Sequence, residues 1–489
     1  MEENYCNGTS RPLLARWSSV GHVSSDAMEE LLESEPLPCG WLARATIWES
    51  RALWILSGAS IIVSIFNFML SLSTQMFVGH LGALELAGAS IANVGIQGLS
   101  YGIMLGMASA VQTVCGQSYG AKKFAAMGII CQRAIILHVA AAVGLTFLYV
   151  YTGPVLRAIG QSAEIAARGQ VFAHGLIPQL YAFALNCPMQ RFLQAQNIVN
   201  PLAYIAVGVF FLHLLLSWVV VFVLGQGLFG AALTLSFSWW LLVIFTAAYI
   251  LVSPSCKQTW TGLSIKAFSG LWSYLKLTIA SAFMLWYMHT HDWLAGAILE
   301  IWYNQGLVVI SGLLPNPEIS LDSISICMNY LTWDLMFMLG LSTAASIRVG
   351  NELGGRHPRV ARFSVVVVVI TCIIISLIFS AVVLIFQNPL SKLFTSDTAV
   401  IKAVSNLTPL LAVSVFLNGI QPILSGVAIG SGWQAIVAYV NLGTYYGIGL
   451  PIGCVLGFKT SMGVEVDKAM DRLKRSSDED VLSLVNDTA

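Results

Sequence analysis

Two acidic residues stand inside long apolar stretches of this 489-residue chain, and their type and placement suit proton chemistry. Glu300 lies in an apolar run at 272–313, and Asp334 lies in another at 323–346. An ionisable side chain inside a membrane segment is costly to bury and therefore marks a functional site by default. A buried carboxyl group can bind and release protons near neutral pH, because burial penalises its charged form. We predict that Glu300 carries a coupling proton and that Asp334 relays or shares it. The alternatives are an interfacial Glu300 and a structural Asp334 near a helix end.

Amide and aromatic side chains accompany the acids and could bind an organic solute. Amides donate and accept hydrogen bonds without adding charge, and aromatic rings stack on flat molecules. The alternative for each side chain is packing or hydrogen bonding between helices. The predicted substrate-binding residues are Tyr303, Asn304, Gln305, Asn418 and Gln421 in the second half of the chain, and Gln75 and Asn186 in the first half.

Metal and covalent chemistry have little support in the sequence. His289, His291 and Asp292 stand close together, but no further ligand accompanies them. The nine cysteines lie singly, without the CxxC spacing of metal and redox sites. The catalytic motif HExxH does not occur. We therefore expect no metal site and no enzyme activity.

The composition makes the lipid bilayer the solvent for most of the chain. Hydrophobic residues make up 57% and charged residues 10% of the sequence, whereas soluble proteins carry about 25% charged residues. Residues 1–51 hold 12 of the 48 charged residues and 464–489 hold 11, so the 412 residues between them hold the other 25. The formal net charge is zero, so nothing indicates nucleic-acid binding.

Eleven apolar stretches are long enough to cross a bilayer as helices, which takes about 20 residues each. With the N-terminus in the cytosol, the loops on the cytosolic side hold nine Lys and Arg residues and those on the other side hold four, which favours this orientation. The predicted spans are 52–76, 86–112, 125–150, 170–190, 200–224, 228–252, 272–313, 323–346, 362–386, 400–427 and 434–457.

An internal repeat relates the two halves of the chain. Residues 106–120 resemble residues 340–354, and each copy leads into a basic loop. Pro188 and Pro422 match at the same offset. Because both basic loops fall on the same side of the membrane, the halves are predicted to be parallel repeats. The expected fold is an all-α, polytopic membrane protein with two parallel helical bundles, of about six and five helices, around a central cavity.

This pattern divides the chain into five segments. The cytosolic N-terminal tail (1–51) precedes an N-terminal helical lobe (52–252), a linker (253–271), a C-terminal helical lobe (272–463) and a charged C-terminal tail (464–489). The repeat also predicts a helix after Val464, where the chain instead carries the charged tail, so the C-terminal lobe is expected to have one helix fewer.

Six ordered motifs resemble the multidrug and toxic compound extrusion (MATE) antiporters. They are 78–82 (VGHLG), 112–120 (QTVCGQSYG), 194–201 (QAQNIVNP), 300–305 (EIWYNQ), 348–354 (RVGNELG) and 426–434 (GVAIGSGWQ). Residues 188–196 and the pair Trp333 and Asp334 are most similar to the vacuolar flavonoid carriers of the plant seed coat. The resemblance implies exchange of protons for a planar organic solute, such as a flavonoid glycoside, across the vacuolar membrane. It also implies that no cofactor is needed. The plasma membrane is the alternative location.

The chain departs from the family pattern in three places. The twelfth helix is missing after Val464, and residues 286–298 are an insertion in the seventh helix. Asn418 stands where the family has an aspartate, as it does in the flavonoid carriers. The missing helix and the insertion motivate one rival interpretation, a transport-deficient isoform that only associates with full-length copies. A flippase for a lipid-linked precursor is the other rival, although the spans hold few of the basic residues that such a substrate would need.

Overall fold

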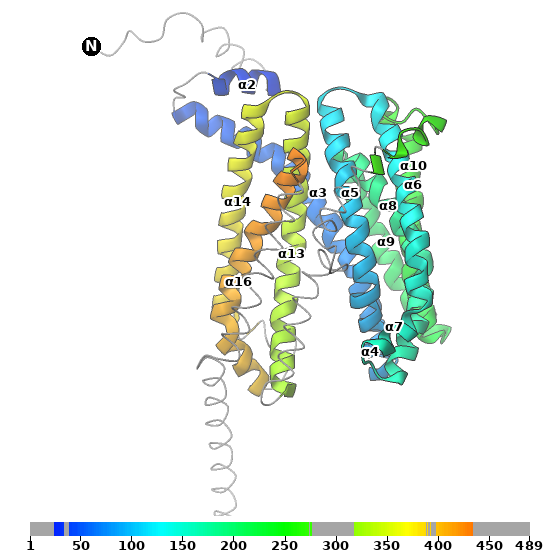
Figure 1. Ribbon diagram of the computed structural model, residues 1–489. Helices are drawn as coiled ribbons and strands as arrows, with labels where there is room; N and C mark the ends of the chain where they lie inside the picture. Colours follow the sequence, from blue (N-terminus) through cyan, green and yellow to red (C-terminus); the bar gives the residue numbers. More distant parts are fainter. Residues whose placement is uncertain are drawn as a thin grey trace, which may run out of the picture.

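The computed structural model describes residues 24–33, 39–272, 274–275, 317–387, 389, 392 and 398–433. In these residues the regular structure is helical (Figure 1). Seven helices in this part of the chain are long and apolar enough to cross a membrane. The predicted spans at 272–313 and 434–457 lie wholly or almost wholly outside the described residues, as do the insertion at 286–298 and the tail from 464.

The described long helices follow the predicted spans but extend beyond most of them. Short elements join them: α7 (Thr152–Ala158) and two 3₁₀ turns, η3 (Pro254–Cys256) and η4 (Ile265–Ala267). The short helix α2 (Ser25–Glu33) precedes them all. The long helical segments are α3 (Cys39–Gly79), α4 (Ala83–Ile91) with η1 (Ala92–Gln97) and α5 (Gly98–Gly120), α6 (Phe124–Val150), α8 (Ala163–Ala195), α9 (Asn200–Trp218) with η2 (Val219–Val223), α10 (Gly227–Val252), α13 (Pro317–Gly354), α14 (Pro358–Ile385) and α16 (Thr398–Ser431).

The helices form two bundles that stand side by side (Figure 1). In the first bundle α8 packs against α4, α5, α6 and α10, and α9 packs against α10. In the second bundle α13, α14 and α16 pack against one another. Large apolar side chains remain exposed on the outer faces of both bundles, for example Phe211 and Ile378, as expected where lipid replaces water.

Helix α3 belongs to both bundles. Leu53 and Ile61 pack into the core of the second bundle, whereas Val63 and Leu70 pack into the core of the first. The helix contacts α13 on one side and α9 on the other. It begins at Cys39, well before the span expected from residue 52. Within this additional part of the helix, the charge of Glu49 is neutralised by Arg348 of α13, a distant partner that sequence hydropathy does not register.

The two repeats meet through reciprocal contacts between their matching segments. A Cβ added at Gly116 would lie 3.7 Å from the Cα of Gly350. A Cβ at Gly120 would overlap the carbonyl oxygen of Asn351, and one at Gly354 would overlap that of Gln117. Gly116 and Gly350 hold the same position in the two repeats, as do Gln117 and Asn351 and also Gly120 and Gly354. The contacts are therefore symmetrical, as parallel repeats about a common axis require.

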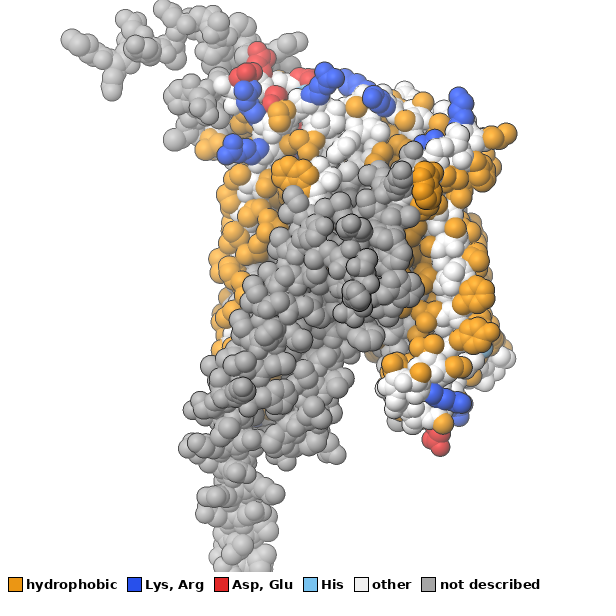
Figure 2. All heavy atoms as spheres, viewed as in Figure 1, with side chains coloured by type: hydrophobic (Ala, Val, Ile, Leu, Met, Phe, Trp, Pro, Cys, Tyr) orange, Lys and Arg blue, Asp and Glu red, His pale blue; other side chains and the backbone are white. Residues whose placement is uncertain are grey.

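Helices α5 and α13, which carry these glycines, end in the same turn. After Gly120 and Gly354 the chain reverses through Lys122 and Arg356, whose φ angles are 58° and 66°. The left-handed conformation is rare for residues other than glycine, so its recurrence at matching positions supports the repeat. Lys and Arg side chains gather at this end of the molecule (Figure 2), where Figure 1 also shows α2. We call the end that carries these two turns the basic end.

Candidate functional site

Asp334 and Asn418 meet in the interior of the second bundle. Asp334 lies on α13 and is 5% exposed. The Asn418 side chain on α16 donates a hydrogen bond from Nδ2 to Oδ2 of Asp334 over 3.1 Å. Oδ1 of Asp334 is buried and has no hydrogen-bond partner among the residues that the structure describes. The carboxyl group is thus held on one side only, and its second oxygen can carry a proton or accept a bond from a ligand.

Close packing of three helices encloses this pair. A Cβ added at Gly419, next to Asn418, would overlap Oγ of Ser376 on α14 and would lie 3.3 Å from Cε of Met338 on α13. The thiol of Cys372 on α14 donates to the carbonyl oxygen of Gly419 over 3.0 Å. Glycine at this position therefore lets α14 and α16 approach closely, and that approach fixes Asn418 beside the acid.

The other predicted binding residues are spread over both bundles. Gln421 lies three residues after Asn418 on α16 and is half-buried, so it shares that face of the helix. Gln75 on α3 is half-buried. Asn186 on α8 is 4% exposed, and its Oδ1 has no partner among the described residues. The structure thus brings together Asp334 and Asn418, and the roles of all these residues stay predictions.

Several predicted residues lie outside the part of the chain that the structure describes. Among them are the proposed proton carrier Glu300 and the substrate-binding candidates Tyr303, Asn304 and Gln305. The weak metal candidates at 289–292 lie there as well. Within the described residues, no group of three or more His, Cys, Asp or Glu side chains is placed to hold a metal ion.

The first bundle contains a polar network that the sequence interpretation missed. Gln97 donates from Nε2 to the hydroxyl of Tyr101 over 3.0 Å and to Oε1 of Gln179 over 3.1 Å. Gln179 in turn donates to Tyr101 over 2.6 Å. The Tyr101 ring stacks on Phe183 at 4.0 Å between centroids. The sequence signal for this network was the presence of glutamines in apolar segments, here on α8 and on the π-helical segment η1. Polar side chains in membrane helices tend to hydrogen-bond to one another across helices.

A second missed feature is a buried ionic cluster at the basic end. Arg348 on α13 donates from Nε and Nη2 to the two carboxylate oxygens of Glu49 on α3, over 3.0 and 2.8 Å. Its Nη1 lies 2.6 Å from Oε1 of Glu352. The side chain of Glu49 is fully buried, and the Arg348 guanidinium lies 5.4 Å from the Trp48 ring centroid. Fork-to-fork pairing of this kind fixes orientation as well as charge.

The cluster continues to His357, in the turn between α13 and α14. Its Nδ1 lies 2.9 Å from Oε2 of Glu352, and its Nε2 lies 2.8 Å from Oδ1 of Asp26 on α2. Partial burial lowers the pKa of the imidazole, but the hydrogen bonds to Asp26 and Glu352 and the charges of both carboxylates outweigh this effect. The net result is that the pKa of His357 is raised above its ordinary value.

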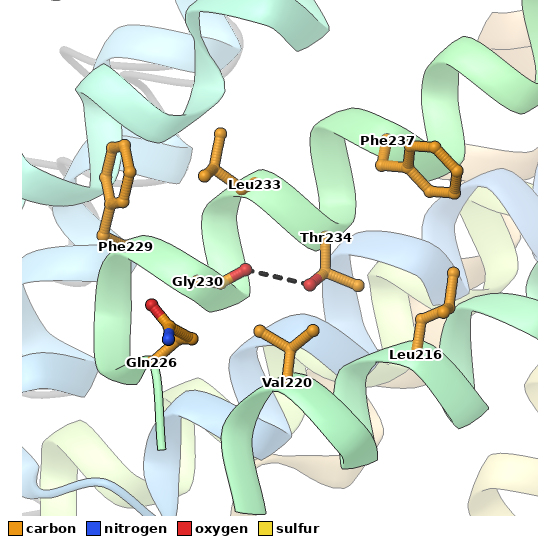
Figure 3. A pocket seen from close by; sticks show the side chains of 8 residues that line it. All are labelled: Leu216, Val220, Gln226, Phe229, Gly230, Leu233, Thr234 and Phe237. Atoms are coloured by element: carbon orange, nitrogen blue, oxygen red, sulfur yellow. Dashed lines mark hydrogen bonds between the residues drawn. The ribbon is translucent and has the colours of Figure 1, made fainter. Parts of the chain in front are cut away.

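A shallow cavity opens on the outer face of the first bundle, between α9, η2 and α10 (Figure 3). Its volume is about 320 Å³, and apolar side chains such as Val220, Phe229 and Phe237 line most of it. Thr234 points into this region, but its hydroxyl is already used in a bond to the carbonyl oxygen of Gly230 over 2.9 Å. The cavity holds none of the predicted site residues and faces the side of the bundle where apolar side chains are exposed.

Comparison with known proteins places the chain among membrane transporters. The family profile MatE matches residues 59–219 and 294–455, which together are more than half of the chain. Protein DETOXIFICATION 41 of Arabidopsis thaliana is 67% identical over 462 residues, covering 93% of this chain and 89% of that protein. Protein DETOXIFICATION 37 of the same plant is 44% identical over 421 residues, covering 86% and 82%.

Solved structures of similar fold confirm the predicted architecture of two helical-bundle repeats. The eukaryotic MATE transporter AtDTX14 superposes with a TM-score of 0.77 at 35% identity, covering 85% of this chain and 90% of that one. The MATE transporter VcmN of Vibrio cholerae superposes with a TM-score of 0.72 at 16% identity, covering 83% and 90%, and this likeness concerns the fold alone. The number of helices in the second bundle stays a prediction.

Proposed function

We propose a coupling ion, a substrate class and a direction of transport for this chain, which belongs to the MATE family of membrane transporters. Membership makes the chain a multi-pass membrane protein that moves small organic compounds, and not an enzyme. Its relatives support the efflux of drugs and toxic compounds by antiport.

The proposed coupling ion is the proton. The contact between Asp334 and Asn418 carries this proposal, because it places a buried acid beside a neutral amide, and the other carboxylate oxygen has no partner in the described part of the chain. Protonation would remove the cost of a buried negative charge without breaking the bond to Asn418. Proton uptake therefore changes the stability of the packing between α13 and α16 while the local geometry persists. We propose that Glu300 is the principal proton carrier and that Asp334 is its partner.

The proposed substrate is a neutral, planar and hydroxylated molecule such as a flavonoid glycoside. The amides of Asn418 and Gln421 can bond to sugar and phenol hydroxyl groups, and Tyr303, Asn304 and Gln305 would extend this surface. Gln75 and Asn186 would serve the first bundle. The buried Oδ1 of Asn186, which has no partner within the described ranges, supports this role, because such an atom gains energy from a ligand donor. The resemblance to vacuolar flavonoid carriers points to the same class.

The proposed direction is from the cytosol into the vacuole, with protons moving the opposite way. Lys and Arg side chains gather at the basic end (Figure 2), and such an excess favours the cytosolic side. Proton binding and substrate binding would favour states of the two bundles that open to opposite sides, so that each drives release of the other.

The test is uptake into sealed vesicles that contain the purified full chain and carry an imposed pH gradient. Labelled flavonoid glucoside is expected to enter when the vesicle interior is acidic, and a labelled organic cation is expected to enter more slowly. Glu300→Gln should abolish this uptake and Asp334→Asn should reduce it. Glu164→Gln, at an exposed acid on α8, is the matched control and should leave uptake unchanged.

Other outcomes would redirect the proposal. Uptake of the organic cation alone would change the proposed substrate class to organic cations, but it would leave the proposed coupling to protons unchanged. Undiminished uptake in both acid variants would remove these residues from the mechanism. Failure of the unmodified chain to transport either compound would favour the transport-deficient isoform.

A further inference from the structure

Helix α2 is docked on the basic end of the second bundle through one apolar face. Met28 is fully buried and Leu31 is 8% exposed. Both belong to a small core with Ala45 of α3 and Val360 of α14. The neighbouring Glu30 is exposed. One buried apolar face and one exposed polar face are typical of a helix that lies on a protein surface. Here that surface belongs to the second bundle of the same chain.

Acidic side chains of α2 bind the start of α14. The Glu29 carboxylate accepts hydrogen bonds from the backbone N–H groups of Arg359 over 3.1 Å and of Val360 over 2.9 Å. These N–H groups lack partners within their own helix, and a negative charge is favoured at that helix end. Asp26 pairs with His357, and Glu33 pairs with Arg359 over 3.1 Å. The acids of α2 therefore match the N-terminal end of α14 and the basic residues beside it.

A second anchor follows at the start of α3. Glu49 is fully buried and holds Arg348 of α13 by two hydrogen bonds. From Leu56 onward, residues of the same helix also join the core of the first bundle. Helix α2 and residues 39–49 of α3, which together we call the strap, are thus fixed to the second bundle, and α3 continues from them into the first.

The seam between the two bundles is closed at the basic end. Thr113 of α5 donates from Oγ1 to the carbonyl oxygen of Ile429 on α16 over 2.6 Å, and Gln117 donates to that of Gly430 over 3.4 Å. Glycines of α5 and α13 bring the backbones together beside these bonds. Opening this seam moves α5 away from α13 and α16. Because α3 is held in both bundles, such opening must either bend α3 or release the strap.

We propose that the strap is a restraint that favours the state closed at the basic end, and that its release from α14 makes opening at that end easier. This role goes beyond the proposed function, because it concerns the equilibrium between two conformations and does not depend on the transported solute. The restraint acts at the protein surface through α2, where a regulator or a modification can reach it without entering the site around Asp334.

The test uses a reporter cysteine at the seam. Gln117→Cys is placed in a full-length chain whose nine native cysteines are replaced by alanine, and its reaction with a maleimide is timed in detergent. Glu29→Gln keeps the size of the side chain but removes the charge that caps α14, and it should raise the labelling rate about fivefold. Glu30→Gln makes the same chemical change one residue later on the exposed face and should leave the rate unchanged. Met28→Asp, which puts a charge into the docking face, should raise the rate further.

A second reporter separates opening from general unfolding. Ala182→Cys lies in the core of the first bundle, where Ala182 is fully buried, and it should stay unlabelled in every variant. Faster labelling at Gln117→Cys alone supports the strap. Equal rates for Glu29→Gln and Glu30→Gln would overturn the proposal. Labelling at both reporters would overturn it as well, because the variants would then unfold the chain and not open the seam.

Discussion

The pair formed by Glu49 and Arg348 offers a quantitative test of how the two bundles are joined. Both oxygens of Glu49 accept from the guanidinium over 3.0 and 2.8 Å, and the two side chains are 0% and 12% exposed. Removing one partner of a buried ion pair leaves the other charge uncompensated, which costs about 3–5 kcal/mol. Because Arg348 keeps its contact with Glu352 at 2.6 Å, we expect Glu49→Gln to lower the free energy of unfolding by less than this, by about 2–3 kcal/mol.

A double-mutant cycle isolates the interaction from the cost of each substitution. Arg348→Met removes the guanidinium near Glu49 and Glu352, so its cost should be at least as large as that of Glu49→Gln. The double variant should lose less than the sum of the two, with a coupling energy of about 2 kcal/mol or more. Unfolding by a denaturing detergent in mixed micelles, followed by tryptophan fluorescence, measures all four chains. A coupling energy below about 0.5 kcal/mol would refute the reasoning, because the pair would then behave like an exposed salt bridge.

Three further predictions concern the acid, the basic end and the seam. Asn418→Ala should destabilise the chain by about 1–3 kcal/mol in the same unfolding assay, because Asp334 would lose the hydrogen bond that Asn418 donates to it; no change would mean that the contact does not form. The pKa of His357 is raised in the folded chain, so the stability that it contributes should be full below its unfolded value of about pH 6.5 and should be lost as the pH rises through the folded value. Thermal unfolding from pH 6 to 8.5 should show this decline, and His357→Gln should flatten it. Gly354→Ala should push α13 away from α5 and raise labelling in the seam assay, whereas Gly144→Ala, with nothing within 4 Å of the added Cβ, should not.

The membrane class, most helix positions and the repeat could be predicted from the chain alone. Apolar runs long enough to span lipid permit few structures, because backbone groups in lipid must bond within their own helix. The predicted span at 125–150 differs from α6 (Phe124–Val150) by one residue at its start. Matching segments such as 106–120 and 340–354 predicted that their helix ends share one side of the membrane, and both helices end there.

Boundaries were less predictable where a charge has a distant partner. The first span was expected from residue 52, but α3 begins at Cys39. Hydropathy counts Glu49 as a polar residue that ends a span. In the folded chain its charge is cancelled by Arg348, which lies 299 residues away in the sequence. No local pattern contains that information.

Asp334 and Asn418 illustrate what the sequence by itself determined about the candidate site. It identified both as polar side chains in apolar spans, because residue type and hydropathy are properties of each segment alone. Only the tertiary structure decided that they touch. The two residues are 84 positions apart in the chain, and their contact depends on the packing of α13 against α16. The same holds for the docking of α2 on α14. An amphipathic helix shows in its own sequence that it needs a partner, but which surface it covers depends on shape and charge assembled from segments more than 300 residues away.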